Sequence, residues 1–259
     1  IIDTSIMPFI VLLIITIGLG MVGCSQQQQK PAGTPAKIIS IGIMPDVESA
    51  PFLIADKNGY YADQGVQVKL VPFKSAKDRD SALQSGQLDG VVTDMVAVIF
   101  ANSGGINLRI CAKTDGNIEL LAGKDSGVTA AADLIGKRVG LSTNTIMEYS
   151  LDRMLEYKQV SPGSVNKVAI PQLPTRLEML QGGKVEAAIL PEPLAGLAIQ
   201  GGATVLASTD QMGNKSGVVA FTAEILHNQP GEVTAVMRAY NEAIKYMQEQ
   251  PLASYIDFV

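Results

Sequence analysis

Residues 79–92, RDSALQSGQLDGVV, are followed 97 residues later by a second version of the same pattern, RLEMLQGGKVEAAI, at residues 176–189. Both copies begin with arginine, pass through Leu-Gln, one further residue and glycine, and end in small and aliphatic residues. A glycine after an apolar stretch is typical of a helix C-terminus, and the aliphatic run behind it predicts a buried strand. The sequence therefore predicts one helix and strand unit that is used twice.

Apolar segments upstream of each copy extend the repeat. Residues 66–72 and 165–171 are apolar runs that hold a proline at their end, and residues 38–43 and 137–141 are runs that contain a glycine. Each half thus predicts the order strand, helix, strand, helix, strand. Strands that alternate with helices favour a parallel sheet with helices on both faces. We expect an α/β fold with two similar lobes and mainly parallel sheets.

The composition fits two cores and argues against one class of partner. The chain has 259 residues, of which 47% are hydrophobic, and this length suits one or two domains. The net charge is -5, acidic and basic residues are interspersed, and no run of lysine and arginine is present to bind phosphates. We therefore expect no nucleic-acid partner.

The first 37 residues differ from the rest of the chain. Residues 6–22 are almost uninterruptedly apolar and end in Met21-Val22-Gly23-Cys24, which resembles a bacterial lipoprotein signal. We expect residues 1–23 to be a signal peptide, and residues 24–37 to be a lipidated N-terminus with a disordered polar spacer. An uncleaved membrane helix is the alternative. Either interpretation places the remaining chain outside the cytoplasm.

A series of short motifs in the rest of the chain carries a resemblance to a known family. In order, the motifs are Pro51-Phe52, Ala55, Gly59-Tyr60-Tyr61, Gly65-Val66, LQSGQLDG, Asp125-Ser126-Gly127, Asp133-Leu134, Gly136-Lys137-Arg138-Val139 and Pro191-Glu192-Pro193. Their order and spacing resemble the substrate-binding proteins of ABC importers, in the branch for nitrate, sulfonate, taurine and thiamine precursors. The resemblance covers about residues 38–259.

This resemblance implies a fold, a division into lobes and a set of partners. The fold is periplasmic-binding-protein-like II, in which two strands form a hinge and the lobes close over one small molecule. Lobe 1 is expected at residues 38–121, lobe 2 at 122–216, and a return to lobe 1 at 217–259 that is C-terminally truncated relative to the family. The implied partners are a small-molecule ligand and the permease and ATPase subunits. The protein is expected to be a monomer without a cofactor, anchored to the cell membrane through lipidated Cys24, at the cell surface or in the periplasm.

Polar residues cluster in the turns that follow the predicted strands. Open α/β sheets bind ligands outside the carboxyl ends of their strands, and helix N-termini offer free N–H groups, so we expect the ligand there. The predicted ligand-binding residues are Asp46, Glu48, Ser49, Phe73, Lys74, Ser75, Thr93, Asp94, Ser142, Thr143, Asn144, Arg176 and Glu192. The residues up to Asp94 belong to lobe 1 and the others to lobe 2, so the two sets are expected to face each other.

Some of these turns also have a purely structural interpretation. Thr145, three residues before Glu148, fits a capping box, and so does Thr175 before Glu178; the hydroxyl would then serve its own helix. Two interpretations of Arg176 stay open. It binds an anion, or it has a structural role at the surface, which Arg79 at the same position of the first copy would share.

The sequence offers little for metal or nucleophilic chemistry. His227 is the single histidine, so we expect neither a histidine-ligated metal site nor a Ser-His-Asp triad in the cleft. With Cys24 lipidated, Cys111 has no cysteine to pair with, and no disulfide is predicted. The strand-like surroundings of Cys111 predict a buried thiol.

Three functions remain open at this point. The leading hypothesis is a solute-binding protein, not an enzyme, that delivers a sulfonate, nitrate or taurine-like molecule, or a pyrimidine, to an ABC importer. The alternatives are an enzyme of the same fold, similar to thiamine-pyrimidine synthases or menaquinone-pathway enzymes, and the sensor lobe of a receptor. The charge of the ligand stays open too, because Lys74 and Arg176 suit an anion whereas the predicted acidic residues suit an amine or a pyrimidine edge.

The lipoprotein hypothesis predicts the behaviour of a Cys24→Ser variant. Without the thiol no lipid can be attached, so the variant should be released from membranes or remain unprocessed. Fractionation of cells and the mass of the mature N-terminus measure this outcome. A Cys24→Ser protein that is cleaved and stays with the membrane would contradict the hypothesis.

Overall fold

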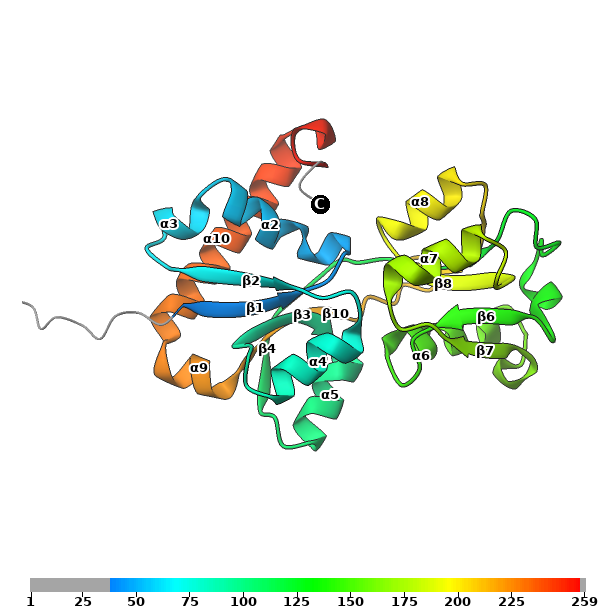
Figure 1. Cartoon of the computed structure of the whole chain (residues 1–259). Coiled ribbons are helices and arrows are strands. Elements are labelled where there is room, and N and C mark those ends of the chain that lie inside the picture. The colour runs from blue at the N-terminus through cyan, green and yellow to red at the C-terminus, as the bar shows by residue number, and fades with distance from the viewer. Residues whose placement is uncertain (1–37, 257–259) are drawn as a thin grey trace, which may run out of the picture. The chain divides into compact units, whose positions relative to one another are not determined.

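Two five-stranded sheets, one in each lobe, organise the part of the chain that this computed structural model describes, residues 38–256 (Figure 1). The predicted signal peptide, Cys24 and the spacer lie outside the described residues. The strand order is β2-β1-β3-β10-β4 in lobe 1 and β7-β6-β8-β5-β9 in lobe 2. Within residues 38–256 no helix combines the length and the apolar character that a membrane crossing needs.

In each sheet a single strand runs against the other four. The strands of lobe 1 are β1 (Ile39–Ile43), β2 (Val68–Pro72), β3 (Gly90–Asp94), β4 (Leu108–Lys113) and β10 (Gly217–Thr222), and those of lobe 2 are β5 (Ile118–Ala122), β6 (Arg138–Leu141), β7 (Asn166–Ala169), β8 (Ala187–Pro191) and β9 (Thr204–Ser208). Strand β1 pairs in parallel with β2 and β3, whereas β10 is antiparallel to β3 and β4. In lobe 2, β6 pairs in parallel with β7 and β8, and β5 is antiparallel to β8 and β9. The predicted α/β fold with two mainly parallel sheets is confirmed.

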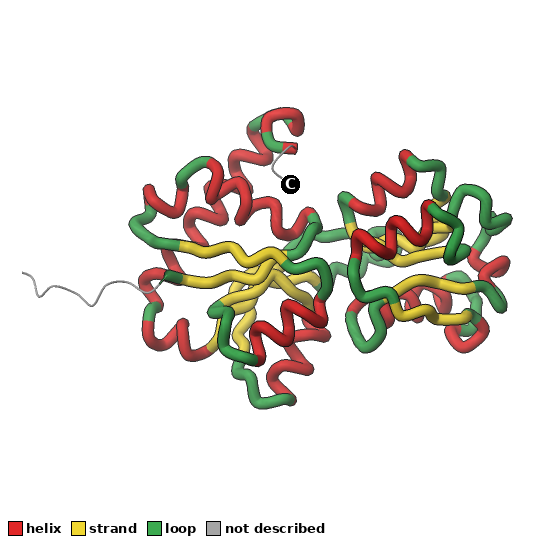
Figure 2. The backbone as a smooth tube through the Cα atoms, viewed as in Figure 1, coloured by secondary structure: helices red, strands yellow, loops and turns green. Residues whose placement is uncertain are grey.

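Helices cover both faces of each sheet, as Figure 2 shows. The helices of lobe 1 are α2 (Ala50–Lys57), α3 (Tyr60–Asp63), α4 (Ala76–Gln84), α5 (Met95–Ser103), α9 (Ala223–Asn228) and α10 (Pro230–Glu249), and those of lobe 2 are α6 (Ile146–Tyr157), α7 (Leu173–Gln181) and α8 (Leu194–Gln200). Short 3-10 turns lie at Val47–Ser49, Ala131–Leu134, Pro162–Ser164 and Leu252–Ser254.

Each lobe has a core on either side of its sheet. In lobe 1, Phe52 of α2 and Tyr240 of α10 pack with Phe221 on one face, while α4 and α5 bury Leu83 and Val98 on the other. In lobe 2, α6 covers one face and α7 and α8 cover the other. Burial of this apolar surface is the largest favourable contribution to the stability of such layers.

The chain passes between the lobes twice. The first crossover, residues 114–117, leads from β4 to β5, and the second, residues 209–216, leads from β9 back to β10. The strand that arrives through a crossover, β5 or β10, is in each case the antiparallel one. In each lobe, the antiparallel strand is therefore the one that comes directly from the other lobe.

The repeated sequence occupies equivalent places in the two lobes. Helix α4 leads into β3 and helix α7 leads into β8, each the middle strand of its sheet. Leu83 and Leu180, which are 97 residues apart, are both buried. Gly86 and Gly183 stand just beyond the helix ends with φ values of 73° and 65°, a left-handed conformation that favours glycine and stops the helix.

The two repeated arginines are buried, so the interpretation of both as surface residues is wrong. Arg79 is 4% exposed and Arg176 is 0% exposed. Arg79 Nη1 donates to the carbonyl of Val92 at 3.0 Å, and Arg176 Nη1 donates to the carbonyl of Ile189 at 2.8 Å. Val92 and Ile189 are also 97 residues apart. Each guanidinium therefore ties its helix to the middle strand of the sheet by the same bond.

Glycines in the neighbouring strands make room for these arginines. A β-carbon placed on Gly42 of β1 would lie 3.2 Å from Cγ of Arg79, and one on Gly140 of β6 would lie 3.4 Å from Cγ of Arg176. The stems of the arginines thus lie over the bare backbone of β1 and β6. Together with the closer contacts that a β-carbon would make with Leu88 Cδ1 at 2.8 Å and Ile170 Cδ1 at 3.0 Å, this approach explains why both predicted strands contain a glycine.

Two further expectations are corrected and one is confirmed. Cys111 is exposed and not buried, because β4 is an edge strand. Thr175 lies inside α7, whose N-cap is Gln172, so it caps no helix. Thr145 is the N-cap of α6 and accepts a hydrogen bond from the Met147 N–H at 3.2 Å, as predicted.

Replacement of Arg176 by methionine should destabilise the protein by about 2–4 kcal/mol, because the carbonyls of Ile170 and Ile189 would lose their donor inside the core. Arg79→Met should act in the same direction. Urea unfolding followed by circular dichroism measures the change. The control is Arg153→Met, which removes an exposed arginine paired with Glu156 and should cost less than about 0.5 kcal/mol. Equal effects of Arg176→Met and the control would contradict the assigned role.

Candidate functional site

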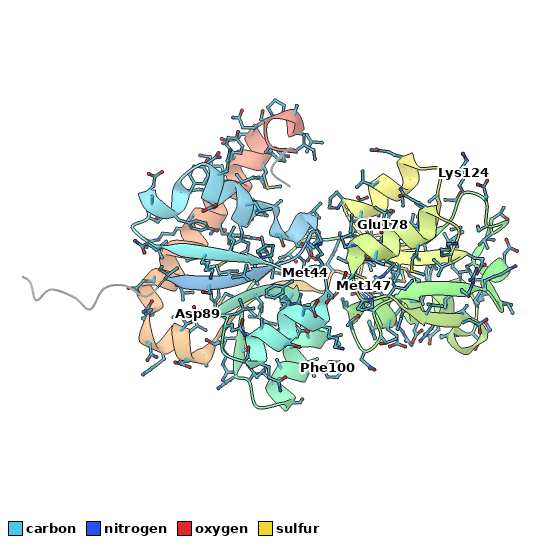
Figure 3. The ribbon with its side chains drawn as sticks, viewed as in Figure 1. Met44, Asp89, Phe100, Lys124, Met147 and Glu178 are labelled. Atoms are coloured by element: carbon cyan, nitrogen blue, oxygen red, sulfur yellow. The ribbon has the colours of Figure 1, made fainter. Side chains whose placement is uncertain are left out.

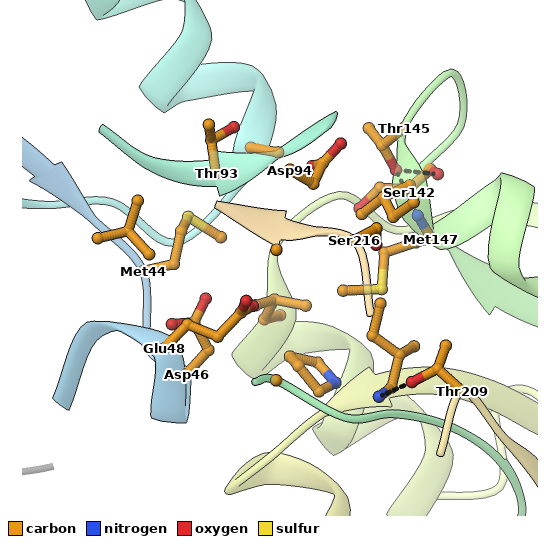
Figure 4. Close-up of a pocket in the computed structure, with 18 of the residues that line it drawn as sticks. Met44, Asp46, Glu48, Thr93, Asp94, Ser142, Thr145, Met147, Thr209 and Ser216 are labelled. Carbon is orange, nitrogen blue, oxygen red and sulfur yellow. Dashed lines mark hydrogen bonds between the residues drawn. The ribbon is translucent and has the colours of Figure 1, made fainter. Parts of the chain in front are cut away.

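A cavity lies where the carboxyl ends of strands from both sheets meet (Figure 4). Lobe 1 contributes Met44, Asp46 and Glu48, which follow β1, and Thr93 and Asp94, which end β3. The remaining lining residues are Ala76, Arg79, Val92, Gly116, Ile118, Ser142, Thr145, Ile146, Met147, Pro171, Leu173, Pro191, Thr209, Asn214, Ser216 and Gly217. Both lobes and both crossovers therefore take part in one cavity.

Backbone hydrogen bonds join the lobes at the rim of this cavity. The Val47 N–H donates to the carbonyl of Glu192 at 2.9 Å, and the Leu173 N–H donates to the carbonyl of Lys74 at 3.0 Å. Met44 of lobe 1 packs into the apolar cluster of α7 and α8. Figure 3 shows Met44 and Met147 of α6 on the sides of the two lobes that meet. The structure is thus in a closed arrangement.

Helix caps and a crossover hold the carboxylates of lobe 1 in place. Asp46 Oδ1 accepts from the N–H and the hydroxyl of Ser49, at 3.1 and 2.9 Å. Asp94 is the N-cap of α5, and its Oδ1 accepts from the Ala97 N–H at 2.9 Å. Glu48 Oε1 accepts from the hydroxyl of Thr114 in the first crossover. The three acids are therefore fixed by their surroundings before any ligand arrives.

Burial makes these carboxylates hard to ionise. It raises the pKa of Asp46 and of Asp94, and the charge of Arg79 lowers both to a smaller extent. Burial, followed by the neighbouring charge of Asp46, raises the pKa of Glu48 to about 7. Perturbed carboxyl groups that gather in one cavity are typical of functional sites.

The lobe 2 side and the second crossover present hydroxyl groups. The Ser142 hydroxyl accepts from Nη2 of Arg176 and donates to the carbonyl of Pro171 at 3.3 Å. The Thr209 hydroxyl donates to Asn117 Oδ1 at 3.0 Å and accepts from the Ile118 N–H at 2.9 Å. These groups are uncharged, so the charge of the cavity comes from lobe 1.

One buried hydroxyl beside the cavity has no partner. Thr93 is 5% exposed, and its Oγ1 makes no hydrogen bond with any residue in the part of the chain that the structure describes. An orphaned buried polar group is costly in an apolar setting. Such a group next to a cavity is suited to a ligand that supplies the missing bond.

The predicted residues that line the cavity are Asp46, Glu48, Thr93, Asp94 and Ser142. Thr143 and Asn144 line an adjoining groove between α4, α5 and the loop before α6. In that loop the Asn144 N–H donates to Glu148 Oε2 at 2.7 Å, which completes the N-terminal cap of α6.

The other predicted residues are not among those that line the cavity. Ser49 accepts from the Met44 N–H, and Ser75 caps α4. Glu192 accepts from the Gly196 N–H at 3.0 Å, and the nitrogens of Arg176 bond to Ser142 and to carbonyls of its own lobe. The last two are Phe73, whose ring packs against apolar clusters of both lobes, and Lys74, whose carbonyl joins the lobes.

Sequence analysis missed the residues that the crossovers bring to the cavity. They are Gly116 from the first crossover and Thr209, Asn214, Ser216 and Gly217 from the second and its end. The prediction considered only turns between a strand and the next helix, and the crossovers connect strands to strands. The polar run at residues 208–216 was a usable signal, because it directly precedes the expected return to lobe 1 at residue 217.

A family model described as "NMT1/THI5 like" matches residues 46–254, which include most of both lobes and every residue that lines the cavity except Met44. The chain belongs to this family. The match agrees with the resemblance found in the sequence, and the two-lobed fold is that of a periplasmic-binding-protein-like protein.

Two curated relatives have names that describe binding. The chain is 22% identical over 247 residues to a protein of Brachyspira hyodysenteriae named as an ABC transporter periplasmic binding protein, a match that covers 89% of this chain and 71% of that one. It is 26% identical over 181 residues to the taurine-binding periplasmic protein of Escherichia coli, over 69% of this chain and 56% of the relative. The match thus spans little more than half of the taurine-binding relative.

Solved structures with the same fold include two further binding proteins. The alkanesulfonate-binding protein of Xanthomonas axonopodis pv. citri is 21% identical, with a TM-score of 0.74, over 88% of this chain and 79% of that one. The nitrate-binding protein of Synechocystis PCC 6803 is 17% identical, with a TM-score of 0.68, over 82% of this chain and 62% of that one. These likenesses establish the fold.

The raised pKa of Glu48 predicts how stability depends on pH. The folded protein holds a proton on Glu48 up to about pH 7, whereas an ordinary glutamate loses it near 4.5. The unfolding free energy should therefore fall as the pH rises from about 4.5 to 7, by about 3 kcal/mol from this group. Glu48→Gln should remove this contribution and flatten the slope in urea unfolding measured at several pH values, while Asp46 and Asp94, whose pKa is also raised, keep a slope of the same sign.

The matched control for this experiment is Glu186→Gln. The hydrogen bond and charge of Arg138 lower the pKa of Glu186 to about 2, so its titration ends well below pH 5. Glu186→Gln should leave the slope between pH 5 and 7 unchanged. A Glu48→Gln variant that keeps the slope of the parent protein would show that the buried acid is another residue.

Proposed function

We propose that this chain is the substrate-binding component of an ABC importer and that it captures a small molecule in the cavity between its lobes. One observation carries the proposal: residues of both lobes and of both crossovers line the same cavity. A molecule held there contacts every part that must move when the lobes separate. Such a site couples capture of the ligand to closure.

The names of the relatives support a small polar ligand of the sulfonate, taurine or nitrate class. One curated relative is a taurine-binding protein, and the structural neighbours bind alkanesulfonate and nitrate. Both curated relatives are periplasmic proteins, which supports a place outside the cytoplasm for this chain. The permease and ATPase subunits of an importer are then the partners of a monomeric binding protein.

Lobe closure supplies the mechanism of capture. In the open protein the bonds from Val47 to Glu192 and from Leu173 to Lys74 would be broken, and residues 114–117 and 209–216 would act as the hinge. A ligand shifts the balance toward the closed form by the contacts that it makes only there. The permease then receives the closed form and releases the ligand by opening it.

A binding role is favoured over the enzyme alternative by the relatives and by the lining of the cavity. The relatives are named as binding proteins. The polar side chains that line the cavity are carboxylates, hydroxyls, an amide and one arginine. They suit recognition of a solute through hydrogen bonds and charge.

Attachment to the membrane is part of the same proposal. We infer that Cys24 carries the lipid and that residues 25–37 tether the lobes to it, on the basis of the Met21-Val22-Gly23-Cys24 sequence. A tethered receptor stays close to its permease, which raises the effective concentration of the pair.

The proposal is tested by screening purified protein for ligands and for closure. Thermal-shift measurements with sulfonates, taurine, nitrate, pyrimidines and amino acids should find a compound that stabilises the protein by about 2.7 kcal/mol at 100 times its Kd. Small-angle scattering should then show a smaller radius of gyration with that compound than without it. Stabilisation without a change in radius would contradict capture between moving lobes.

The orphaned hydroxyl of Thr93 gives a sharp prediction. Thr93→Val keeps the shape of the side chain and removes a hydroxyl without a protein partner, so folding stability should stay the same or rise. Calorimetry with the identified ligand should show binding weaker by about 1–1.5 kcal/mol. The control is Ser150→Ala, which removes another buried orphan hydroxyl that does not line the cavity and should leave binding unchanged. Unchanged binding by Thr93→Val would remove Thr93 from the site.

A further inference from the structure

Three of the four charged residues that line the cavity in the described part of the chain are acidic. Asp46, Glu48 and Asp94 are acidic, and Arg79 is the one basic residue among the described residues that line it. Asp46 and Glu48 lie next to each other, and Asp94 lies across the cavity from them (Figure 4). The mutual repulsion of these groups reaches across the space, because the charges of both Asp46 and Asp94 raise the pKa of Glu48.

Arg79 does not pair with these acids. Its Nε donates to Asp80 Oδ1 at 2.9 Å and its Nη1 donates to the carbonyl of Val92. Its Nη2 lies 2.8 Å from the same Asp80 oxygen but makes no hydrogen bond with the described residues. Among residues 38–256 no ion pair includes any of the three cavity acids. The charge of Arg79 lowers the pKa of all three acids, but one guanidinium stands against three carboxyl groups, so the cavity keeps an excess of acidic groups.

The arrangement of the acids suits an organic cation better than a metal ion. In the described part of the chain, no three His, Cys, Asp or Glu side chains come close enough together to hold one metal ion. The acids instead stand on two sides of the cavity and each uses one oxygen in a local hydrogen bond. The unpartnered hydroxyl of Thr93, next to Asp94 in sequence and 5% exposed, adds a further polar contact for a ligand.

We propose that the ligand carries a protonated nitrogen group, an ammonium or an amidinium, and that the carboxylates of Asp46, Glu48 and Asp94 receive it. This inference rests on the proposed function, because it names the ligand class of the same cavity. Hydrogen bonds from a charged nitrogen to a carboxylate are among the strongest in proteins. The hydroxyls of Ser142, Thr145 and Thr209 then face the uncharged or anionic remainder of the molecule. Taurine, which has an ammonium and a sulfonate, belongs to this class, whereas nitrate and simple alkanesulfonates do not.

Binding of such a cation should be linked to pH. Glu48 is surrounded by Asp46, by Asp94 of β3, by Arg79 of α4 and by the Thr114 hydroxyl, and its charge also reaches Tyr240 of α10. A cation favours the ionised acid, so its binding should release protons and tighten as the pH rises from 6 to 8. An anion would show the reverse dependence.

The test uses pairs of compounds that differ in the charged nitrogen. Taurine is compared with isethionate, 4-aminobutanol with 1,4-butanediol, and benzamidine with benzamide, with nitrate and ethanesulfonate as simple anions. Thermal shift and calorimetry at pH 8 should show at least one nitrogen cation that binds ten or more times more tightly than its partner. Equal or tighter binding of the uncharged partners or of the simple anions would overturn the inference and leave the proposed function standing. Binding of none of these compounds would count against both.

Charge-neutralising variants assign the contact to the acids. Glu48→Gln and Asp94→Asn keep the shapes of the side chains and should each weaken binding of the cation about tenfold. The control Glu249→Gln removes an exposed acid of α10 that pairs with Lys245 and should leave binding unchanged. If the variants bind the cation as tightly as the parent and remain folded, the carboxylates do not receive it.

Discussion

The bond from a buried guanidinium to a strand carbonyl is the interaction on which both lobes depend. Arg79 and Arg176 reach the middle strand of their sheets at Val92 and Ile189, over a glycine in the neighbouring strand. A buried cation without such partners would be strongly destabilising. The same bonds fix the centres of β3 and β8, two residues before Asp94 and Pro191 at the cavity, and Arg176 also orients the hydroxyl of Ser142. The helix, the strand and the rim of the site are therefore positioned by one side chain in each lobe.

Closure of the lobes brings the carboxyl ends of the strands of both sheets together, and the residues at these ends determine which ligand the cavity can bind. Carboxyl ends of parallel strands offer N–H groups and polar turns, which by themselves would suit an anion. In this protein, Asp46 and Asp94 accept hydrogen bonds at the starts of the 3-10 turn Val47–Ser49 and of α5. These helix starts are thus occupied by carboxyl groups of the chain itself, and lobe 1 presents acidic groups to the ligand.

Much of the fold was predictable because each copy of the repeat is a short, continuous stretch of sequence. The glycines that end α4 and α7, the strands that follow them and the two-lobed α/β arrangement could all be predicted from residues close together in the sequence. The burial of Arg176 could not, because an arginine at a helix start looks the same whether it faces solvent or a strand carbonyl. The exposure of Cys111 was likewise hidden, because it depends on β4 lying at the edge of its sheet.

The candidate site was predictable only where it follows the strand-to-helix turns. Asp46, Glu48, Thr93, Asp94 and Ser142 were found by that rule. Ser75 and Glu192 obey the same rule but bond to their own helices, and Ser49 accepts from the Met44 N–H. Which partner each side chain takes depends on the folded geometry. Thr209 and Ser216 lie in a crossover, whose course depends on how the two lobes meet.

The central claim is that one small molecule is held between the lobes. A crystal structure of the protein grown with the solute that raises its melting temperature most tests the claim directly. The account predicts electron density for that solute between Asp46, Asp94 and Ser142, with the Val47 to Glu192 bond intact. Density for the solute on the outer surface of either lobe, with the cavity holding only water, would contradict it.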